Sequence, residues 1–201
     1  MKKIITIGRQ FGSGGREVGQ KVAQALHIAY YDKELLMVAV KKSGLSSQFM
    51  NTYDEKPTRS FLYSLVMGQR GLFPDGGEVT VEQLAANAQR DAILSVAGEG
   101  GCVIVGRCAD YVLRDMDHVT HIFLYASLEK RVERIMRLEH VDADKARELI
   151  RKTDKQRKSY YNFFADGNWG VRSNYDLMLR TDDHTPEEIA EMIITYAHPG
   201  K

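Results

Sequence analysis

Glycines and polar residues follow the first apolar run of the chain. Residues 4–7 are all β-branched and mostly apolar, and Gly12, Ser13, Gly14 and Gly15 come shortly after them, ahead of an amphipathic stretch. Glycines let a backbone curl so tightly that successive N–H groups and the first turn of the next helix converge on one anion. The spacing therefore predicts a phosphate-binding loop. The ordinary alternative is a glycine-rich turn between a strand and a helix.

This loop departs from the Walker pattern G-x-x-x-x-G-K-[ST] at the two positions that carry its chemistry. When residues 12–14 are aligned with the G-S-G of that pattern, Gly15 stands at the lysine position and Arg16 at the Ser/Thr position. The backbone features of a phosphate loop are therefore present, whereas the usual cation and the usual hydroxyl are not.

The elements that must position this loop are predicted from the apolar patterns along the chain. Short apolar runs predict strands, and periodic apolar positions between them predict helices. The predicted strands cover residues 4–7, 27–31, 102–105, 119–125 and 175–179, and the predicted helices cover 15–27, 33–43, 80–97, a stretch from 128 and a stretch from 186. This alternation is typical of a three-layer α/β fold, a parallel sheet of about five strands with helices on both faces.

Ligands of such sheets bind beyond the carboxyl ends of the strands. That edge is expected to gather the 8–16 loop, Asp32, Arg107 and the start of a basic segment, residues 129–158. The segment holds eleven Lys or Arg against seven Asp or Glu, an excess of four positive charges. Most of these charges are interpreted as a solvated helical face, but the edge as a whole is predicted to handle an anion.

Composition limits the class of protein. A chain of 201 residues, 43% hydrophobic and 27% charged, suits one soluble domain over residues 1–201. The net charge of +1 gives no reason to expect nucleic-acid binding, and no run approaches a membrane span. Cys102 and Cys108 fit no disulfide framework, which favours a reducing cytoplasm. The six histidines show no metal-ligand spacing, so no residue is assigned to a metal.

Two further motifs resemble a known family. Residues 103–107 read V-I-V-G-R, and residues 126–134 read A-S-L-E-K-R-V-E-R. The cytidylate kinases carry a strand ending in G-R-D-x-G and then a strand running into A-S-x-E-x-R-x-x-R. Together with residues 5–17 and 31–35, these motifs make the chain similar to the cytidylate kinase-like branch of the P-loop nucleoside monophosphate kinases. The resemblance runs from residue 3 to about 195 and is weakest across 45–79.

The resemblance implies phosphoryl transfer from ATP to a nucleoside monophosphate, with Mg²⁺ and a closing lid. Residues 45–79 would be a helical acceptor-side insertion and residues 139–165 a helical lid. Arg107 matches the arginine of G-R-D-x-G, which faces the acceptor nucleotide in the family, and Arg131 matches the arginine at the lid's base. The implied site residues are Gly12, Ser13, Gly14, Gly15, Arg16 and Glu17 for ATP, Arg16, Arg131, Asp154 and Arg157 for catalysis, and Asp32, Lys33 and Arg107 for the acceptor.

The departures from the family's pattern fall mainly on the cation, the metal ligand and the acceptor side. Arg16 replaces the loop lysine if the turn contains one extra residue, and Glu17 or Asp110 is a candidate for the missing Mg²⁺ ligand. Cys108 stands where G-R-D-x-G has its aspartate, so CMP specificity is not inherited. Lys33, Lys41 and Arg59 are all candidates for the missing acceptor charge.

The chain keeps only the second half of the family's lid motif, R-D-x-x-D-x-x-R. Asp154 and Arg157 match its end, while its first two positions fall on Ile150 and Arg151. The ordinary alternative for Asp154 and Arg157 is an i,i+3 salt bridge, and for Asp32 it is a helix N-cap.

The sequence therefore leaves three candidate functions: a nucleoside monophosphate kinase, a nucleotide-binding sensor or scaffold with little turnover, and a kinase for a non-nucleotide small molecule. The expected partner is a small-molecule nucleotide acceptor, with neither nucleic acid nor membrane, and a homodimer is left open.

Overall fold

The computed structural model describes residues 3–32 and 81–197, with residues 81–86 and 88 described by their backbone alone. The elements are β1 (Ile4–Arg9), α1 (Gly15–Leu26), β2 (Ala29–Tyr31), α5 (Val81–Glu99), β3 (Cys102–Val105), α6 (Ala109–Val112), β4 (Val119–Tyr125), α7 (Leu128–Glu139), α8 (Ala143–Phe164), a 3-10 turn (Arg172–Asn174), β5 (Leu177–Arg180) and α9 (Pro186–Ala197). The predicted helix at 33–43, the insertion at 45–79, and Lys33, Lys41 and Arg59 lie outside the described residues.

The chain divides into two compact units. One consists of Met1–Asp32 with Val96–Lys201, and the other of Lys33–Ser95. The first unit contains every described strand. Within the second, the described part is the helical stretch 81–95 of α5.

The five strands form one parallel sheet in the order β2-β3-β1-β4-β5, which confirms the predicted fold class. Strand β1 lies at the centre and extends two residues beyond the predicted run. Gly8 pairs with Phe123 and Arg9 with Leu124, so the ladder with β4 continues to Arg9. This extension brings Arg9 to the carboxyl edge of the sheet.

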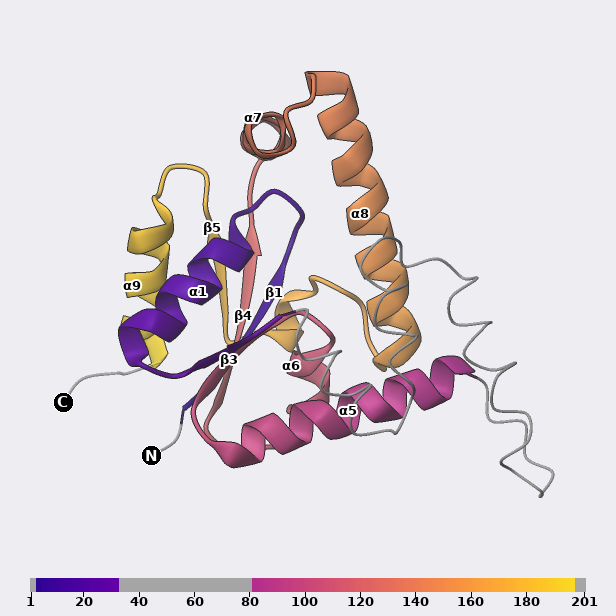
Figure 1. The fold of residues 1–201 in the computed structure, drawn as a ribbon, viewed down its shortest axis with the longest axis vertical. Coiled ribbons are helices and arrows are strands. Elements are labelled where there is room, and N and C mark those ends of the chain that lie inside the picture. The colour runs from indigo at the N-terminus through magenta and orange to yellow at the C-terminus, as the bar shows by residue number, and fades with distance from the viewer. Residues whose placement is uncertain (1–2, 33–80, 198–201) are drawn as a thin grey trace. The chain divides into compact units, whose positions relative to one another are not determined.

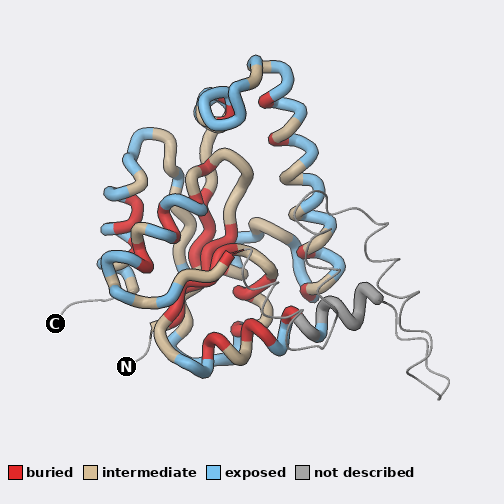
Figure 2. The backbone as a smooth tube through the Cα atoms, viewed as in Figure 1, coloured by how far each residue is buried: buried red, intermediate tan, exposed pale blue. Residues whose placement is uncertain are grey.

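One face of the sheet is covered by α1 and α9, which lie side by side (Figure 1). Their apolar sides and the strands share a core that contains Ile5, Ile7, Val18, Val22, Ala23, Val103, Val105, Ile122, Leu124, Ile189, Ala190 and Ile193. Figure 2 shows the same concentration of buried residues in the strands and in the inner turns of these two helices. Helix α9 begins as predicted, because Thr185 and Glu188 exchange capping hydrogen bonds at 2.8 and 3.2 Å.

The C-terminal end of α8 packs against α6. Cys108, Tyr161 and Ala165 form a buried cluster there, with further aromatic rings around it. The aromatic run at 160–164 therefore attaches the end of the basic segment to the unit that contains the sheet. Both cysteines are buried free thiols, and burial raises the pKa of the Cys108 thiol to about 12.

Helices α7 and α8 form a hairpin at the carboxyl end of the sheet (Figure 1). Val132 and Ile135 of α7 pack against Ala146 and Ile150 of α8, and Phe11 of the glycine loop packs against the same cluster. Ser127 caps α7, its hydroxyl accepting from the Lys130 N–H at 3.4 Å, and the helix begins at Leu128 as predicted. Among the described residues, no helix combines the length and apolar character needed to cross a bilayer.

Candidate phosphate-binding site

The glycine loop is held against the first turns of α7. Gly12 has a φ of 83°, a left-handed conformation that residues with a Cβ rarely adopt. A Cβ on Gly12 would also lie 3.0 Å from Cβ of Arg131 and 3.1 Å from its carbonyl oxygen. Glycine is therefore required here both by the backbone conformation and by the close approach of α7.

Ser13 fixes the inside of the loop. Its buried hydroxyl donates to the Gln10 carbonyl at 2.9 Å, and its own carbonyl accepts from the Thr181 hydroxyl at 3.0 Å. Thr181 follows β5, so the loop is tied to the end of a second strand. In this arrangement the Ser13 hydroxyl supports the backbone of the loop.

Arg9 lies in the middle of the site, although no sequence motif identified it as a site residue. Its side chain is 17% exposed, and its Nη2 donates to Oδ1 of Asp32 at 3.4 Å. A Cβ on Gly15 would lie 2.7 Å from Cβ of Arg9, and one on Gly106 would lie 1.8 Å from its Nη1. Burial lowers the pKa of Arg9, and the Asp32 carboxylate opposes this effect. The two glycines therefore leave the space that this guanidinium occupies.

Asp32 is buried between two guanidinium groups. Its Oδ2 lies 3.7 Å from Nε of Arg16, whose side chain is 62% exposed, while Oδ1 faces Arg9. The sequence placed Asp32 at the edge of the sheet, and the structure brings it to both arginines. The helix that it was alternatively expected to cap lies outside the described residues.

Asp154 and Arg157 of α8 both bind the glycine loop. Oδ1 of Asp154 accepts from the Phe11 N–H at 2.7 Å, and its Oδ2 pairs with Nη1 of Arg131. Nη1 of Arg157 donates to the Arg9 carbonyl at 3.0 Å, and its guanidinium lies 5.5 Å from the ring centroid of Phe11. Burial, with repulsion from Arg9, lowers the pKa of Arg157 to about 9, which leaves it charged at neutral pH.

Arg134 is a second arginine that the sequence analysis did not select, although it closes the A-S-x-E-x-R-x-x-R motif. Its guanidinium lies over Gly14, where a Cβ would be 2.9 Å from Nη1. It forms an ion pair with Glu17 in the first turn of α1. Glu17 therefore lies beside the loop, as expected, and its carboxylate neutralises Arg134.

Arg107 follows β3 in an unusual backbone conformation. Gly106, Arg107 and Cys108 have φ values of 78°, 61° and 55°, three left-handed residues in succession. Arg107 is close enough to Arg9 to contribute to lowering the pKa of Arg9. It therefore lies on the same edge as Asp32 and the loop.

Asp110, one of the two candidates for the Mg²⁺ ligand, is buried in α6. Its Oδ2 accepts from the Tyr161 hydroxyl at 2.8 Å. Burial raises the pKa of Asp110, an effect that this hydrogen bond opposes. These contacts do not suit a metal ligand.

The described residues offer Mg²⁺ few protein oxygens, since they contain no cluster of three or more His, Cys, Asp or Glu side chains that would hold a metal. Mg²⁺ in phosphoryl-transfer sites is commonly held by one or two carboxylates together with phosphate oxygens and water. Asp32 fits that role because it is a buried carboxylate at the edge that carries the loop.

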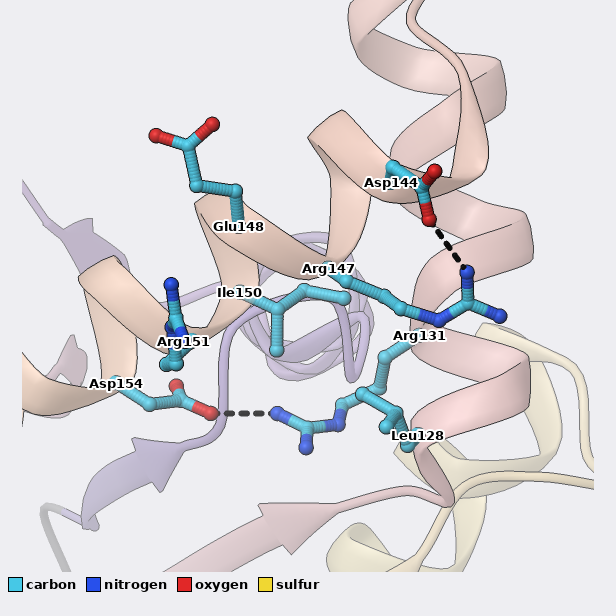
Figure 3. A pocket seen from close by; sticks show the side chains of 8 residues that line it. All are labelled: Leu128, Arg131, Asp144, Arg147, Glu148, Ile150, Arg151 and Asp154. Carbon is cyan, nitrogen blue, oxygen red and sulfur yellow. Dashed lines mark hydrogen bonds and ion pairs between the residues drawn. The ribbon is translucent and has the colours of Figure 1, made fainter.

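A groove of about 450 Å³ is lined by residues of both α7 and α8. Figure 3 shows Arg131 and Asp154 pointing toward each other across it, and Arg147 pairing with Asp144 at 3.2 Å. Arg151, which stands beside the unmatched position of the lid motif, lines the groove as well. The hairpin thus presents three arginines to this groove, of which Arg131 also contacts the glycine loop.

Comparisons with known proteins agree with this architecture. The model of the cytidylate kinase-like family matches residues 4–183. The cytidylate kinase of Thermoplasma acidophilum is 25% identical over 191 residues, which cover 94% of this chain and 89% of that protein. A uronate isomerase of Corynebacterium glutamicum is 32% identical over 160 residues, which cover 76% of this chain; the chain spans only 30% of that relative's length.

Solved structures show the same fold. The crystal structure of an uncharacterized protein from Eubacterium ventriosum superposes with a TM-score of 0.73 at 29% identity and covers 98% of both chains. Shikimate kinase from Bacteroides thetaiotaomicron superposes with a TM-score of 0.53 at 15% identity, again over 98% of both chains, a likeness of fold alone. With the family model matching 180 of 201 residues, from 4 to 183, the chain belongs to the cytidylate kinase-like family.

Proposed function

We propose that this protein transfers a phosphoryl group from ATP, bound with Mg²⁺, to a nucleoside monophosphate. The family and the fold support a kinase-type role on a nucleotide or small molecule. The observation that carries the finer proposal is the gathering of arginines around one glycine loop. They are Arg9, Arg16, Arg107, Arg131, Arg134 and Arg157.

This charge pattern suits phosphoryl transfer. The transferring group spreads negative charge over three oxygens, so catalysis consists largely of positioning and of electrostatic stabilisation by cations. Three carboxylates, Asp32, Asp154 and Glu17, pair with arginines of the set. Because so many guanidinium groups gather at one loop, an anion with several oxygens is the ligand that suits this part of the described structure best.

Each part of the site has a role in this proposal. The backbone of residues 12–15 binds the ATP phosphates, and Arg16 and Glu17 border them from the first turn of α1. Bound Mg²⁺ would neutralise phosphate charge, and Asp32 is the residue that would hold it. Arg131 and Arg157 clamp the transferring group from the hairpin, and Asp154 positions Arg131. Arg107 contacts the acceptor, whereas Lys33, the other acceptor residue that the sequence implied, lies outside the described residues.

The test is a coupled assay of ADP release with ATP–Mg²⁺ and a panel of nucleoside monophosphates and small alcohols. Acceptor-dependent release with at least one monophosphate is expected. Arg107→Ala should raise KM for the acceptor more than for ATP, because Arg107 is assigned to the acceptor. Arg137→Met, an exposed change on α7 outside the site, is the matched control. Release that no monophosphate stimulates would refute the proposal.

A second candidate is a nucleotide-binding sensor with negligible turnover. It is favoured by glycine at the lysine position and by the engagement of the Ser13 hydroxyl with the Gln10 carbonyl. Calorimetric binding of ATP without acceptor-dependent ADP release would support it. A kinase for a non-nucleotide alcohol is the third outcome of the same panel.

A further inference from the structure

The side chain of Arg9 lies where the lysine of a Walker loop would begin. Gly15 occupies the lysine position of that pattern, and a Cβ placed on it would lie 2.7 Å from Cβ and 2.8 Å from Cγ of Arg9. Contacts this short with a buried stem cannot be accommodated without displacing it. A lysine at position 15 and an arginine at position 9 therefore exclude each other in this fold.

The backbone conformation does not explain why residue 15 is a glycine. It begins α1, and its φ lies outside the left-handed range. Any residue could adopt that conformation, so the reason for glycine is the space taken by Arg9. The same guanidinium also excludes a side chain from Gly106 at the end of β3, since a Cβ there would lie 1.8 Å from Nη1.

The position of Arg9 is fixed from two sides. Asp32 accepts from Nη2, and Arg157 donates to the Arg9 carbonyl. Arg9 ends β1 and contacts the end of β3, the neighbouring strand, and the space beyond adjacent strand ends is where parallel sheets bind ligands. A guanidinium that is 17% exposed is less screened by water than that of Arg16, which is 62% exposed.

We propose that Arg9 is the phosphate-binding cation of the glycine loop, reaching the phosphate chain from the end of β1 in place of a lysine on the first turn of α1. The inference rests on the proposed function, since it deepens the description of that same site. It assigns to Arg16 a peripheral contact from the solvent side. It also explains why the loop keeps its glycines while lacking its lysine.

The test separates phosphate binding from turnover. Binding of inorganic tripolyphosphate and of ATP–Mg²⁺ is measured by calorimetry, and ADP release is measured in parallel. Arg9→Met, which keeps an apolar stem, should weaken both ligands by about 100-fold. Arg9→Lys should weaken them less, and Arg16→Met by less than about 10-fold. Arg137→Met is the matched control, and thermal unfolding of each variant verifies that it is folded.

Moving the positive charge from residue 9 to residue 15 gives a more specific test than the single variants. Gly15→Lys alone should lower the melting temperature and weaken tripolyphosphate binding, because the new side chain meets Arg9. The double variant Arg9→Ala/Gly15→Lys should bind tripolyphosphate at least about 10-fold more tightly than Arg9→Ala, because the lysine then enters the vacated space.

The outcomes distinguish this inference from the proposed function. Arg9-dependent tripolyphosphate binding without ADP release would support the inference and refute the kinase. Turnover that survives Arg9→Met in a folded protein would overturn the inference and leave the kinase standing. A wild-type protein that binds neither tripolyphosphate nor ATP would overturn both.

Discussion

Asp154 on α8 accepts a hydrogen bond at 2.7 Å from the backbone N–H of Phe11 in the glycine loop, 143 residues earlier in the chain. Its other oxygen pairs with Arg131 on α7. One carboxylate thus joins three segments, the loop and both helices of the hairpin. Asp154 therefore helps to hold the loop against both helices, together with the contacts of Arg131 and Arg157 with backbone carbonyls of residues 9–11.

Replacing Asp154 by alanine is expected to destabilise the protein by about 1 to 3 kcal/mol, because it leaves a half-buried guanidinium and a backbone N–H without their acceptor. Urea unfolding would measure the change. Asp144→Ala is the matched control, since Asp144 pairs with Arg147 on the same helix but is 98% exposed, and its loss should leave the midpoint unchanged. Equal midpoints for both variants would contradict the assigned role of Asp154.

Gly12→Ala is expected to cost about 1 to 2 kcal/mol of stability, since alanine is strained at a φ of 83° and its Cβ would meet α7. ATP binding should weaken as well, because the loop must shift. Gly98→Ala is the control: a Cβ there meets nothing within 4 Å, and the residue lies in a helix. A gain of up to about 1 kcal/mol is expected from helix propensity. Chemical denaturation measures the free energy of unfolding of both variants. A similar loss of stability in the two would contradict the close approach of Gly12 to α7.

Asp110 should make stability depend on pH in an unusual direction. Because burial raises its pKa in the folded state above the ordinary 3.8, the folded protein holds this proton more tightly than the unfolded chain does. Stability from this group is therefore full below pH 3.8 and falls as the pH rises from 3.8 to the raised folded value. Asp110→Asn keeps an acceptor for Tyr161 and removes the charge, so the free energy of unfolding of the variant should gain on the wild type from pH 4 to pH 7. If the free energies of unfolding of the wild type and of Asp110→Asn changed in parallel over that pH range, the raised pKa of Asp110 would be contradicted.

Tyr161→Phe is expected to destabilise the protein by about 1 to 3 kcal/mol, because the hydroxyl donates to buried Asp110 and accepts from Asn174 at 3.3 Å. Since Tyr161 lies in α8 one turn beyond Arg157, ADP release should fall as well. Tyr196→Phe serves as the control, since the Tyr196 hydroxyl contacts the Asp176 carbonyl on the surface. Thermal unfolding and the coupled assay provide the two readouts, and an unchanged melting temperature for Tyr161→Phe would contradict the buried bond.

Arg131→Met should reduce ADP release by about 100-fold or more, since Arg131 is proposed to clamp the transferring group. Arg147→Met removes a charge from the same groove, but Arg147 pairs with an exposed partner, and a change of less than about 3-fold is expected. Comparable losses in the two variants would indicate that general charge, and not the placement of Arg131, governs turnover.

Local patterns predicted the fold class and the place of the glycine loop at the end of the first strand. The five strands and the starts of α7 and α9 follow from residues that act on their near neighbours in sequence. Arg9 and Arg134 were missed because their roles depend on contacts through space, between β1 and β3 and between α7 and the loop. Gly15 carried the missing signal for Arg9, because its backbone conformation does not require glycine and the stem of Arg9 fills the space beside it. The predictions for residues 33–80 stay predictions, because these residues lie outside the described part of the chain.

The left-handed run at residues 106–108 ties Arg107 to the packing beside it. Arg107 and Cys108 each hold a conformation that costs a non-glycine residue about 1 to 2 kcal/mol, so the turn persists only because its surroundings hold it in place. Cys108 is buried in a cluster with Tyr161 and Ala165, next to further aromatic rings. Mutations in that cluster would relax the turn and redirect Arg107 through its neighbour in the chain, so the direction of this arginine depends on aromatic packing as well as on its own residue type.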